Sequence, residues 1–172
     1  MDIQKEVFNT KTFDKVLAYR GSEKELLDLF ELSFGYRMPI ELWRWKYRGL
    51  DVLGALLRNK STPVAFFGGM PRAVYFLGVA QLAVQIGDVM VHPRARGLLL
   101  RKGAFFRVAS FYFECFVGKD KKYSVAYGFP HLKHLRLAEH LGVYERVGEL
   151  KSVSWEPLNS LPKWHYKIRE FD

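Results

Sequence analysis

The sequence predicts a mixed α/β fold, in one domain that covers all 172 residues. Three observations lead to this prediction. Hydrophobic residues recur with the helical period in some segments and alternate as in strands in others. The predicted elements follow the order β-α-α-β-β-β-α-β-α-β-β, without an internal repeat. The composition, with 49% apolar and 26% charged residues, is that of a globular protein with a sizeable core. The sequence does not show whether a further domain follows Asp172.

The first third of the chain predicts one strand and two helices. Residues 15–20 (KVLAYR) predict a short strand. Residues 21–35 predict a helix with Ser22 as its N-cap and Glu25 as the second member of a capping box. Residues 39–49 (PIELWRWKYRG) predict a second helix that is unusually aromatic and begins at a proline.

Extended segments follow from residue 53. Residues 53–59 (LGALLRN) and 63–69 (PVAFFGG) are expected to form a hairpin, and residues 72–78 and 81–91 continue the sheet. The tandem glycines Gly68 and Gly69 mark a bend or bulge in this set.

The second half of the chain alternates helices and strands. A long helix is predicted over Leu99–Val117, a strand over residues 123–129 and a helix over residues 130–143. Because a helix connects the strand before it to the strand after it, these two strands are expected to be parallel neighbours in a right-handed crossover. Residues 144–155 and 163–171 predict two more strands.

Composition and charge limit the classes of function. The single cysteine, Cys115, excludes an internal disulfide and is expected to be an inert core thiol. The cytoplasm is the expected location, since no N-terminal signal pattern occurs. Residues 73–87 are weakly charged but contain two glutamines and Gly78, so we expect two strands and not a membrane span. The net charge of +9 leaves open a nucleic acid, an anionic membrane or a phosphorylated small molecule as a partner, beside an ordinary solvated surface.

The segment between the strand that ends at Val91 and the long helix is strongly basic. Its charged residues are Arg94, Arg96, Arg101 and Lys102, and its glycines are Gly97 and Gly103. A loop that leaves a central strand and enters a helix offers unpaired backbone N–H groups and the positive end of the helix dipole. The segment is therefore a candidate site for a pyrophosphate-bearing ligand, or else a solvated loop whose glycines only make a turn.

Two segments, together with the element order over nearly the whole chain, resemble the GNAT superfamily of acyl-CoA-dependent N-acyltransferases. Residues 89–97 (VMVHPRARG) resemble the end of the family's fourth strand and the start of its phosphate-binding loop. Residues 128–148 (GFPHLKHLRLAEHLGVYERVG) resemble its fifth strand, its fourth helix and the leucine–glycine ending. The resemblance implies an α/β GNAT fold, acetyl-CoA or another acyl-CoA as co-substrate, and no metal.

The resemblance also implies the cofactor-binding residues. Backbone groups at the end of the fourth strand would meet the pantetheine arm, and the loop after it would hold the pyrophosphate. These residues are Met90, Val91, Arg96, Gly97, Leu98, Arg101, Lys102, Gly103 and Ala104. The chain departs from the family pattern, since Leu99 and Arg101 stand where glycine and glycine or alanine are expected. Either the loop is longer here, with residues 102–104 in the glycine role, or the phosphate contacts differ.

The acid and base that the family often uses are not visible. The positions of the base hold Gln85 and Gly87, and the position of the acid holds Ala138. The candidate catalytic residues are therefore His131, which can titrate near neutral pH, and Tyr127 on the strand before it. The alternatives are a solvated histidine on a helix face and a packed strand aromatic.

Other residues have structural explanations of equal or greater weight. Asp88 is expected to point to the opposite face of its strand from Gly87 and to be structural. His131 and His134 lie one helical turn apart, but no carboxylate or cysteine stands nearby in sequence, so no metal site is predicted. His92 is expected to be a turn residue. The aromatic residues of the second helix either line an acceptor pocket or simply pack: Trp43, Trp45 and Tyr47.

Three functions remain open. The first is an acyl-CoA-dependent N-acyltransferase, an acetyltransferase in the simplest case, with a CoA thioester and a small-molecule or peptide amine as its partners. The second is a non-catalytic CoA-binding or regulatory module, which the missing acid and base favour. The third, a nucleic-acid binder, is not expected, because the basic residues are not interleaved with aromatic residues in a recognisable motif. No membrane partner is expected, and a homodimer is left open.

Overall fold

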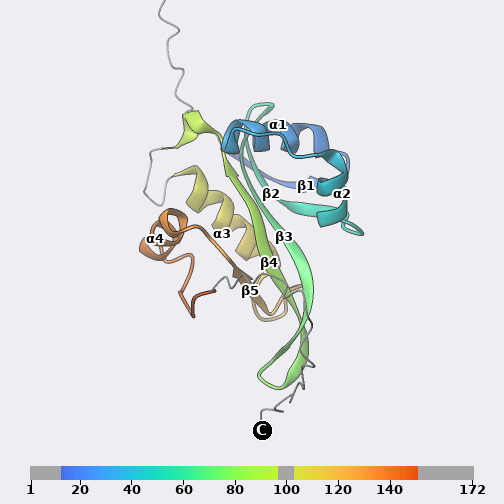
Figure 1. Cartoon of the computed structure of the whole chain (residues 1–172), viewed down its shortest axis with the longest axis vertical. Helices are drawn as coiled ribbons and strands as arrows, with labels where there is room; N and C mark the ends of the chain where they lie inside the picture. Colours follow the sequence, from blue (N-terminus) through green and yellow to red (C-terminus); the bar gives the residue numbers. More distant parts are fainter. Residues whose placement is uncertain (1–12, 97–102, 151–172) are drawn as a thin grey trace, which may run out of the picture.

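The computed structural model describes residues 13–96 and 103–150, which form a five-stranded sheet with helices on both faces (Figure 1). The strands lie in the order β1-β2-β3-β4-β5. Neighbouring strands are antiparallel except β4 and β5, which are parallel, as predicted for two strands joined through a helix. The strands are β1 (Phe13–Tyr19), β2 (Val52–Asn59), β3 (Thr62–Phe76), β4 (Val79–Val91) and β5 (Val125–Gly128).

The helices lie in two layers. On one face of the sheet lie α1 (Glu23–Phe34) and α2 (Ile40–Lys46), and on the other lies α3 (Ala104–Phe116) (Figure 1). Next to α3 lies α4 (Leu132–His140), and a 3-10 turn, η2 (Pro93–Ala95), follows β4. The mixed α/β class and the predicted order of elements through α4 are confirmed.

A separate apolar cluster is buried on each face of the sheet. Successive residues of β3 point alternately into the one cluster and the other. Phe66 packs with α1 and α2, and Phe67 packs with α3, since neighbouring strand residues point to opposite faces. Both side chains are fully buried. Truncating a core phenylalanine to alanine typically costs about 3–5 kcal/mol, so both clusters depend on this strand.

The tandem glycines of β3 make room for a tyrosine hydroxyl on each face. A Cβ atom on Gly68 would lie 2.3 Å from Tyr47 Oη, and one on Gly69 would lie 2.3 Å from Tyr112 Oη. The prediction of a bend or bulge at these glycines is confirmed as a bulge, since the register of β3 with β4 shifts between Phe66 and Gly68. The extra residue of this bulge lies on the neighbouring strand, between Gly87 and Met90.

The predicted capping box at the start of α1 is also wrong. Ser22 occupies the N-cap position, but its side chain makes no capping hydrogen bond. Glu25 instead accepts a hydrogen bond from Arg58 of β2 at 2.5 Å, and Glu23 accepts one from the backbone N–H of Gly21 at 2.8 Å. The carboxylate of Glu25 therefore ties α1 to the sheet and is not available to cap its own helix.

Two boundaries near the C-terminus differ from the prediction. Residues 144–150 form no strand, so that part of the predicted strand 144–155 is wrong. Its remainder and the predicted strand 163–171 lie outside the described residues. The helix predicted from residue 130 begins at Leu132, because His131 is its N-cap and accepts a hydrogen bond from the backbone N–H of Lys133 at 3.3 Å.

A half-buried histidine packs α4 against α3. The ring of His134 makes an edge contact with Phe105, with centroids 4.8 Å apart, and stacks on Tyr144 at 5.8 Å. Its Nε2 atom is buried and has no hydrogen-bond partner among the described residues. Burial lowers the pKa of His134, because the charged imidazolium loses its hydration.

We expect His134→Phe to stabilise the protein by about 1 kcal/mol at pH 7, because an unpaired buried nitrogen is removed and both ring contacts remain. The pKa of His134 is lower in the folded than in the unfolded protein, so the unfolded chain binds more protons as the pH falls below about 6.5. Wild type should therefore lose more stability than the variant between pH 7 and pH 5. Urea unfolding at both pH values measures this. Equal losses in the two proteins would contradict the prediction.

Candidate active site

The fourth strand has a free edge near its carboxyl end. The parallel pairing of β4 with β5 runs from Ala83 and Val125 to Ile86 and Gly128, where β5 ends. Among the described residues, β4 continues to Val91 with β3 as its only neighbouring strand. An extended ligand that contains amide groups can pair with such an edge as an added strand would.

A bulge lies at the start of this free edge. Gly68 pairs with Gly87 and Phe66 pairs with Met90, so two residues of β4, Asp88 and Val89, face the single residue between Gly68 and Phe66. Asp88 adopts a left-handed backbone conformation, with φ of 52°. Aspartate tolerates this conformation better than bulky residues do. The bulge turns the backbone of β4 just where β5 ends.

The bulge also reverses the expected direction of Asp88. Its carboxylate receives a hydrogen bond from Lys46 Nζ at 2.5 Å and one from Tyr47 Oη at 3.0 Å. Tyr47 lies over Gly68, the partner of Gly87. Asp88 therefore lies on the same face as Gly87, and the prediction that it points to the opposite face is wrong, because an extra strand residue shifts the alternation by one.

The ion pair between Asp88 and Lys46 is largely buried from solvent. The side chain of Asp88 is 7% exposed and that of Lys46 is 18% exposed. Burial, followed by the charge of the Asp88 carboxylate, holds the pKa of Tyr47 well above its usual range, so Tyr47 remains a hydrogen-bond donor. These groups join α2 to the bulge. Asp88 is thus occupied as a structural anchor, as expected from the sequence.

The predicted pantetheine-binding residues lie on the free edge. Met90 is fully buried, with its side chain packed on the α1 side of the sheet. The carbonyl oxygen of Val91 accepts hydrogen bonds from Arg96 Nε at 3.0 Å and from Ser33 Oγ at 3.3 Å. The assignment of Met90 and Val91 to a CoA site stays a prediction.

Arg96 ties the start of the loop to α1. Besides its bond to Val91, its Nη2 atom donates to the carbonyl oxygen of Ser33 at 2.6 Å. The guanidinium thus binds two backbone carbonyls, and it remains exposed. His92 is a turn residue as expected, since it caps η2 by accepting a hydrogen bond from the backbone N–H of Arg94 at 3.2 Å.

The far end of the predicted loop meets the start of α3. Gly103 is the N-cap of this helix, and Ala104 is its first residue and lies in the core. The unpaired N–H groups of the first turn attract anions. The intervening predicted residues lie outside the described residues: Gly97, Leu98, Arg101 and Lys102.

The two candidate catalytic residues flank the end of β5. Tyr127 pairs with Gln85 in the sheet register, so both lie on the face covered by α1 and α2. His131 follows three residues after β5 and is exposed, with Nδ1 engaged in the cap of α4. Ala138, at the position of the usual family acid, is fully buried. Sequence reasoning missed the pairing of Tyr127 with Gln85, since it depends on the register of two strands about 40 residues apart.

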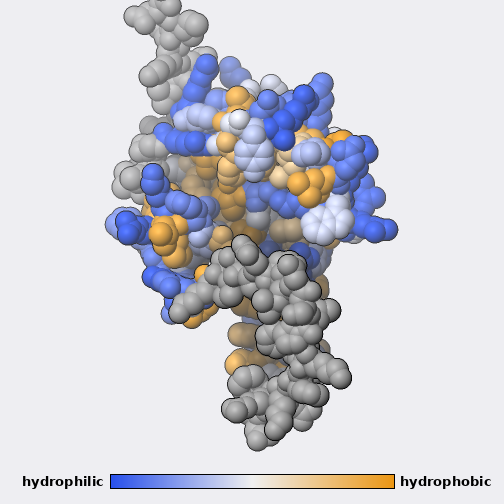
Figure 2. All heavy atoms as spheres, in the orientation of Figure 1, coloured by the Kyte–Doolittle hydropathy of each residue, from blue (hydrophilic) through white to orange (hydrophobic). Residues whose placement is uncertain are grey.

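The aromatic residues of α2 divide into two roles. Trp43 and Tyr47 are buried and pack on Phe66, with ring centroids 6.0 Å and 6.4 Å away. Trp45 is 69% exposed. In the view of Figure 2, apolar side chains line a hollow between the α1–α2 side of the molecule and α4. Two other hollows, of about 290 and 410 Å³, contain no residue of β4 or β5 and so do not coincide with the free edge.

Within residues 13–96 and 103–150, no three histidine, cysteine, aspartate or glutamate side chains come together as metal ligands. None of the helices in the same ranges is long and apolar enough to cross a membrane.

Known structures share this architecture, although no protein-family model and no curated protein matches the chain. A glucosamine-6-phosphate N-acetyltransferase from Arabidopsis thaliana is 17% identical with a TM-score of 0.58, over 83% of this chain and 98% of that one. A transcriptional regulator from Bacillus halodurans C-125 is 14% identical with a TM-score of 0.63, over 83% and 99%. The chain has the GNAT acetyltransferase fold.

A third similar structure contains a ligand. It is an aminoglycoside N-acetyltransferase in complex with the bisubstrate analogue CoA-S-monomethyl-acetylneamine, 14% identical with a TM-score of 0.58, over 84% of this chain and 98% of that one. The similarity extends over almost the whole of each matched chain. It makes the fold of this chain that of a GNAT protein.

Proposed function

We propose that the protein is an acyl-CoA-dependent N-acyltransferase that transfers an acyl group, acetyl in the simplest case, to a primary amine. One observation carries the proposal. Beside the bulge at Asp88, the edge of β4 that faces away from β3 has no neighbouring strand over Gly87–Val91 among the described residues, and a basic segment of the sequence separates it from the first turn of α3. The edge suits the amide groups of a pantetheine arm, and the loop with the helix start suits a pyrophosphate.

The chemistry needs few side chains. The amine nitrogen attacks the thioester carbonyl, the new C–N bond forms, the C–S bond breaks, the amine loses a proton and the thiolate gains one. A backbone N–H on the free edge of β4 would polarise the carbonyl. Tyr127 is the candidate proton donor to the thiolate, and water or His131 would accept the proton of the amine. Proximity of the two substrates supplies much of the remaining acceleration.

A CoA thioester should stabilise the folded protein. At 100 times its dissociation constant, acetyl-CoA should add about 2.7 kcal/mol to the free energy of unfolding. Thermal unfolding with acetyl-CoA, longer acyl-CoAs and free CoA measures this, with AMP at the same concentration as the control for general anion binding. The absence of a shift with any CoA compound at millimolar concentration would contradict the proposed site.

A second function, a non-catalytic CoA-binding module, is favoured by one set of observations. Gln85, Gly87 and Ala138 occupy the positions that often supply the base and the acid in the family, and the carboxylate of Asp88 is held by Lys46 and Tyr47. Thiol release with a panel of amines separates the two functions. Tight CoA binding without turnover on any amine would assign the module. The single cysteine supports a reducing compartment, the cytoplasm, for either function.

A further inference from the structure

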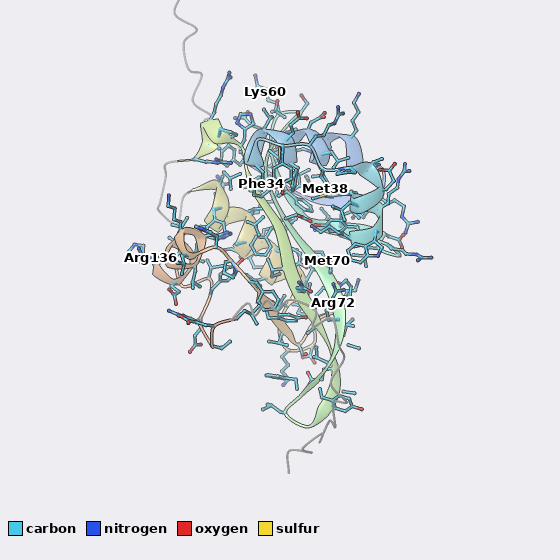
Figure 3. The ribbon with its side chains drawn as sticks, in the orientation of Figure 1. Phe34, Met38, Lys60, Met70, Arg72 and Arg136 are labelled. Carbon is cyan, nitrogen blue, oxygen red and sulfur yellow. The ribbon has the colours of Figure 1, made fainter. Side chains whose placement is uncertain are left out.

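The strands beneath the proposed active site present one polar row on the face covered by α1 and α2. Met70 of β3 pairs with Gln85 of β4, and Gln85 pairs with Tyr127 of β5, so the three lie side by side on one face. Arg72 lies two residues after Met70 and therefore on the same face. Figure 3 shows Met70 and Arg72 along β3, below Phe34 and Met38.

The side chain of Arg72 extends along this row toward Gln85. Its Nε atom donates to Gln85 Oε1 at 3.1 Å, and its Nη1 atom donates to the carbonyl oxygen of Pro71 at 3.1 Å. The side chain is exposed, and its Nη2 atom makes no hydrogen bond to the described residues. Because the amide oxygen of Gln85 is used by Arg72, the group that Gln85 can still offer a ligand is its NH2 donor.

The row carries positive charge without a free carboxylate. Arg72 is the sole cationic residue of β3, β4 and β5, and Asp88 is their sole acidic residue. Asp88 is already neutralised by Lys46 at 2.5 Å and hydrogen-bonded by Tyr47. An acceptor with a second ammonium group would therefore be repelled by Arg72 and would find no free carboxylate on these strands. An acceptor with an oxyanion would instead find three hydrogen-bond donors: the guanidinium of Arg72, the side-chain NH2 of Gln85 and the phenol of Tyr127.

The register gives the distance between this row and the site of transfer. Gln85 precedes Gly87, at the start of the bulge, by two strand residues, which is about 7 Å. Arg72 is held at the level of Gln85. An amine that reacts beside Gly87 can thus place an anionic group against Arg72 if about six bonds separate the two.

Resting on the proposed N-acyltransferase function, we propose that the acceptor is a primary amine that carries an oxyanion, a carboxylate or a phosphate, about 7 Å from its nitrogen. Arg72 binds the oxyanion and excludes polycationic acceptors. Arg72 is thereby a specificity-determining residue.

The test compares three amines of equal length: 6-aminohexanoate, its neutral amide 6-aminohexanamide and the dication 1,6-diaminohexane. An aminoalkyl phosphate of matched length identifies which oxyanion is preferred. Binding is measured by calorimetric titration in the presence of CoA, and kcat/KM is measured with acetyl-CoA by thiol release. We expect the carboxylate or the phosphate to bind about 10- to 100-fold more tightly than the neutral amide, which corresponds to one charged hydrogen-bond partner. The diamine should bind most weakly.

Substitutions of Arg72 test whether this residue causes the preference for an anionic amine. Arg72→Gln should abolish the preference for the anion, and Arg72→Glu should reverse it in favour of the diamine. Lys60→Gln removes the same charge at the opposite end of β3, far from Arg72 (Figure 3), and should leave the preference unchanged.

The outcomes separate this inference from the proposed function. Turnover of the diamine or the amide as efficient as that of the anionic amines would overturn the inference and support N-acyl transfer. Arg72-dependent binding of the anionic amine without thiol release would support the acceptor class and overturn the acyltransferase. If no anionic amine binds more tightly than the neutral amide, or if Lys60→Gln removes the preference as Arg72→Gln does, the inference is wrong.

Discussion

Lys46→Met should lower the free energy of unfolding by about 3–5 kcal/mol, because it leaves the carboxylate of Asp88 buried without its cation. Methionine retains most of the apolar stem of lysine, so the loss reports the charge and not the packing. The carboxylate would keep a single neutral donor, Tyr47, at 3.0 Å. Urea unfolding of wild type and variant measures the difference.

Two controls make this prediction specific. In Lys46→Met/Asp88→Asn no charge remains buried, and asparagine tolerates the φ of 52° at this position, so most of the lost stability should return. Lys15→Met breaks an ion pair with Glu114 that spans 3.8 Å between side chains 40% and 65% exposed, and should cost less than about 1 kcal/mol. A Lys46 variant no less stable than the Lys15 variant would show that Asp88 does not depend on its partner.

The ion pair also has a consequence for binding. Asp88 holds the bulge that turns the backbone of β4 beside the proposed thioester site. We therefore expect Lys46→Met to reduce the stabilisation by acetyl-CoA as well as the intrinsic stability, and the double variant to recover part of both. An unchanged acetyl-CoA shift in Lys46→Met would separate the bulge from the cofactor site.

Tyr127→Phe should lower kcat/KM for acyl transfer by about 10²- to 10⁴-fold, the usual contribution of a general acid, with acetyl-CoA binding retained. The phenol lies opposite Gln85 in the register and has no carboxylate beside it on the strands, so it is the proton donor that we propose for the leaving thiolate. The wild-type rate should rise toward alkaline pH, as more of the acceptor amine becomes neutral. A pH–rate profile with thiol release as the readout measures both effects.

His131→Ala is the matched comparison. His131 caps α4, so its loss should cost about 1 kcal/mol of stability and change the rate little if water accepts the proton of the amine. A limb of the wild-type profile near neutral pH, where histidines ordinarily titrate, that disappears in His131→Ala together with a 10²- to 10⁴-fold loss would assign the base to His131 instead. A Tyr127→Phe enzyme as fast as wild type would remove Tyr127 from the mechanism.

Local patterns in the sequence determined the elements of the fold. The helical spacing of Leu26, Leu29 and Phe30 marks the buried stripe of α1, and all three are buried. The alternating segments after residue 53 became β2, β3 and β4. Helix and strand periods are properties of neighbouring residues, so they need no knowledge of tertiary contacts. The resemblance of residues 89–97 and 128–148 to GNAT motifs added the fold family, which the solved structures confirm.

Contacts between distant residues were decided by the tertiary structure. Glu25 fits a capping box on local pattern alone, yet Arg58 lies close enough in space to take its carboxylate. Gly68 and Gly69 indicate a bend or bulge on local pattern, but only the tertiary structure shows that each makes room for a tyrosine hydroxyl. When a side chain such as that of Glu25 could bond either to its own helix or to a distant residue, the folded sheet decides which of the two partners lies close enough to bond.

The candidate site shows the same division. The sequence by itself determined a basic, glycine-containing segment between a buried strand and a helix, and it placed Gln85, Gly87 and Ala138 where acid and base groups are often found. The tertiary structure decided the direction of Asp88, the row formed by Arg72, Gln85 and Tyr127, and the point where β5 leaves β4. Each of these depends on strand register, and a bulge of one residue moves a side chain to the other face of a sheet without any change in the local pattern of residues.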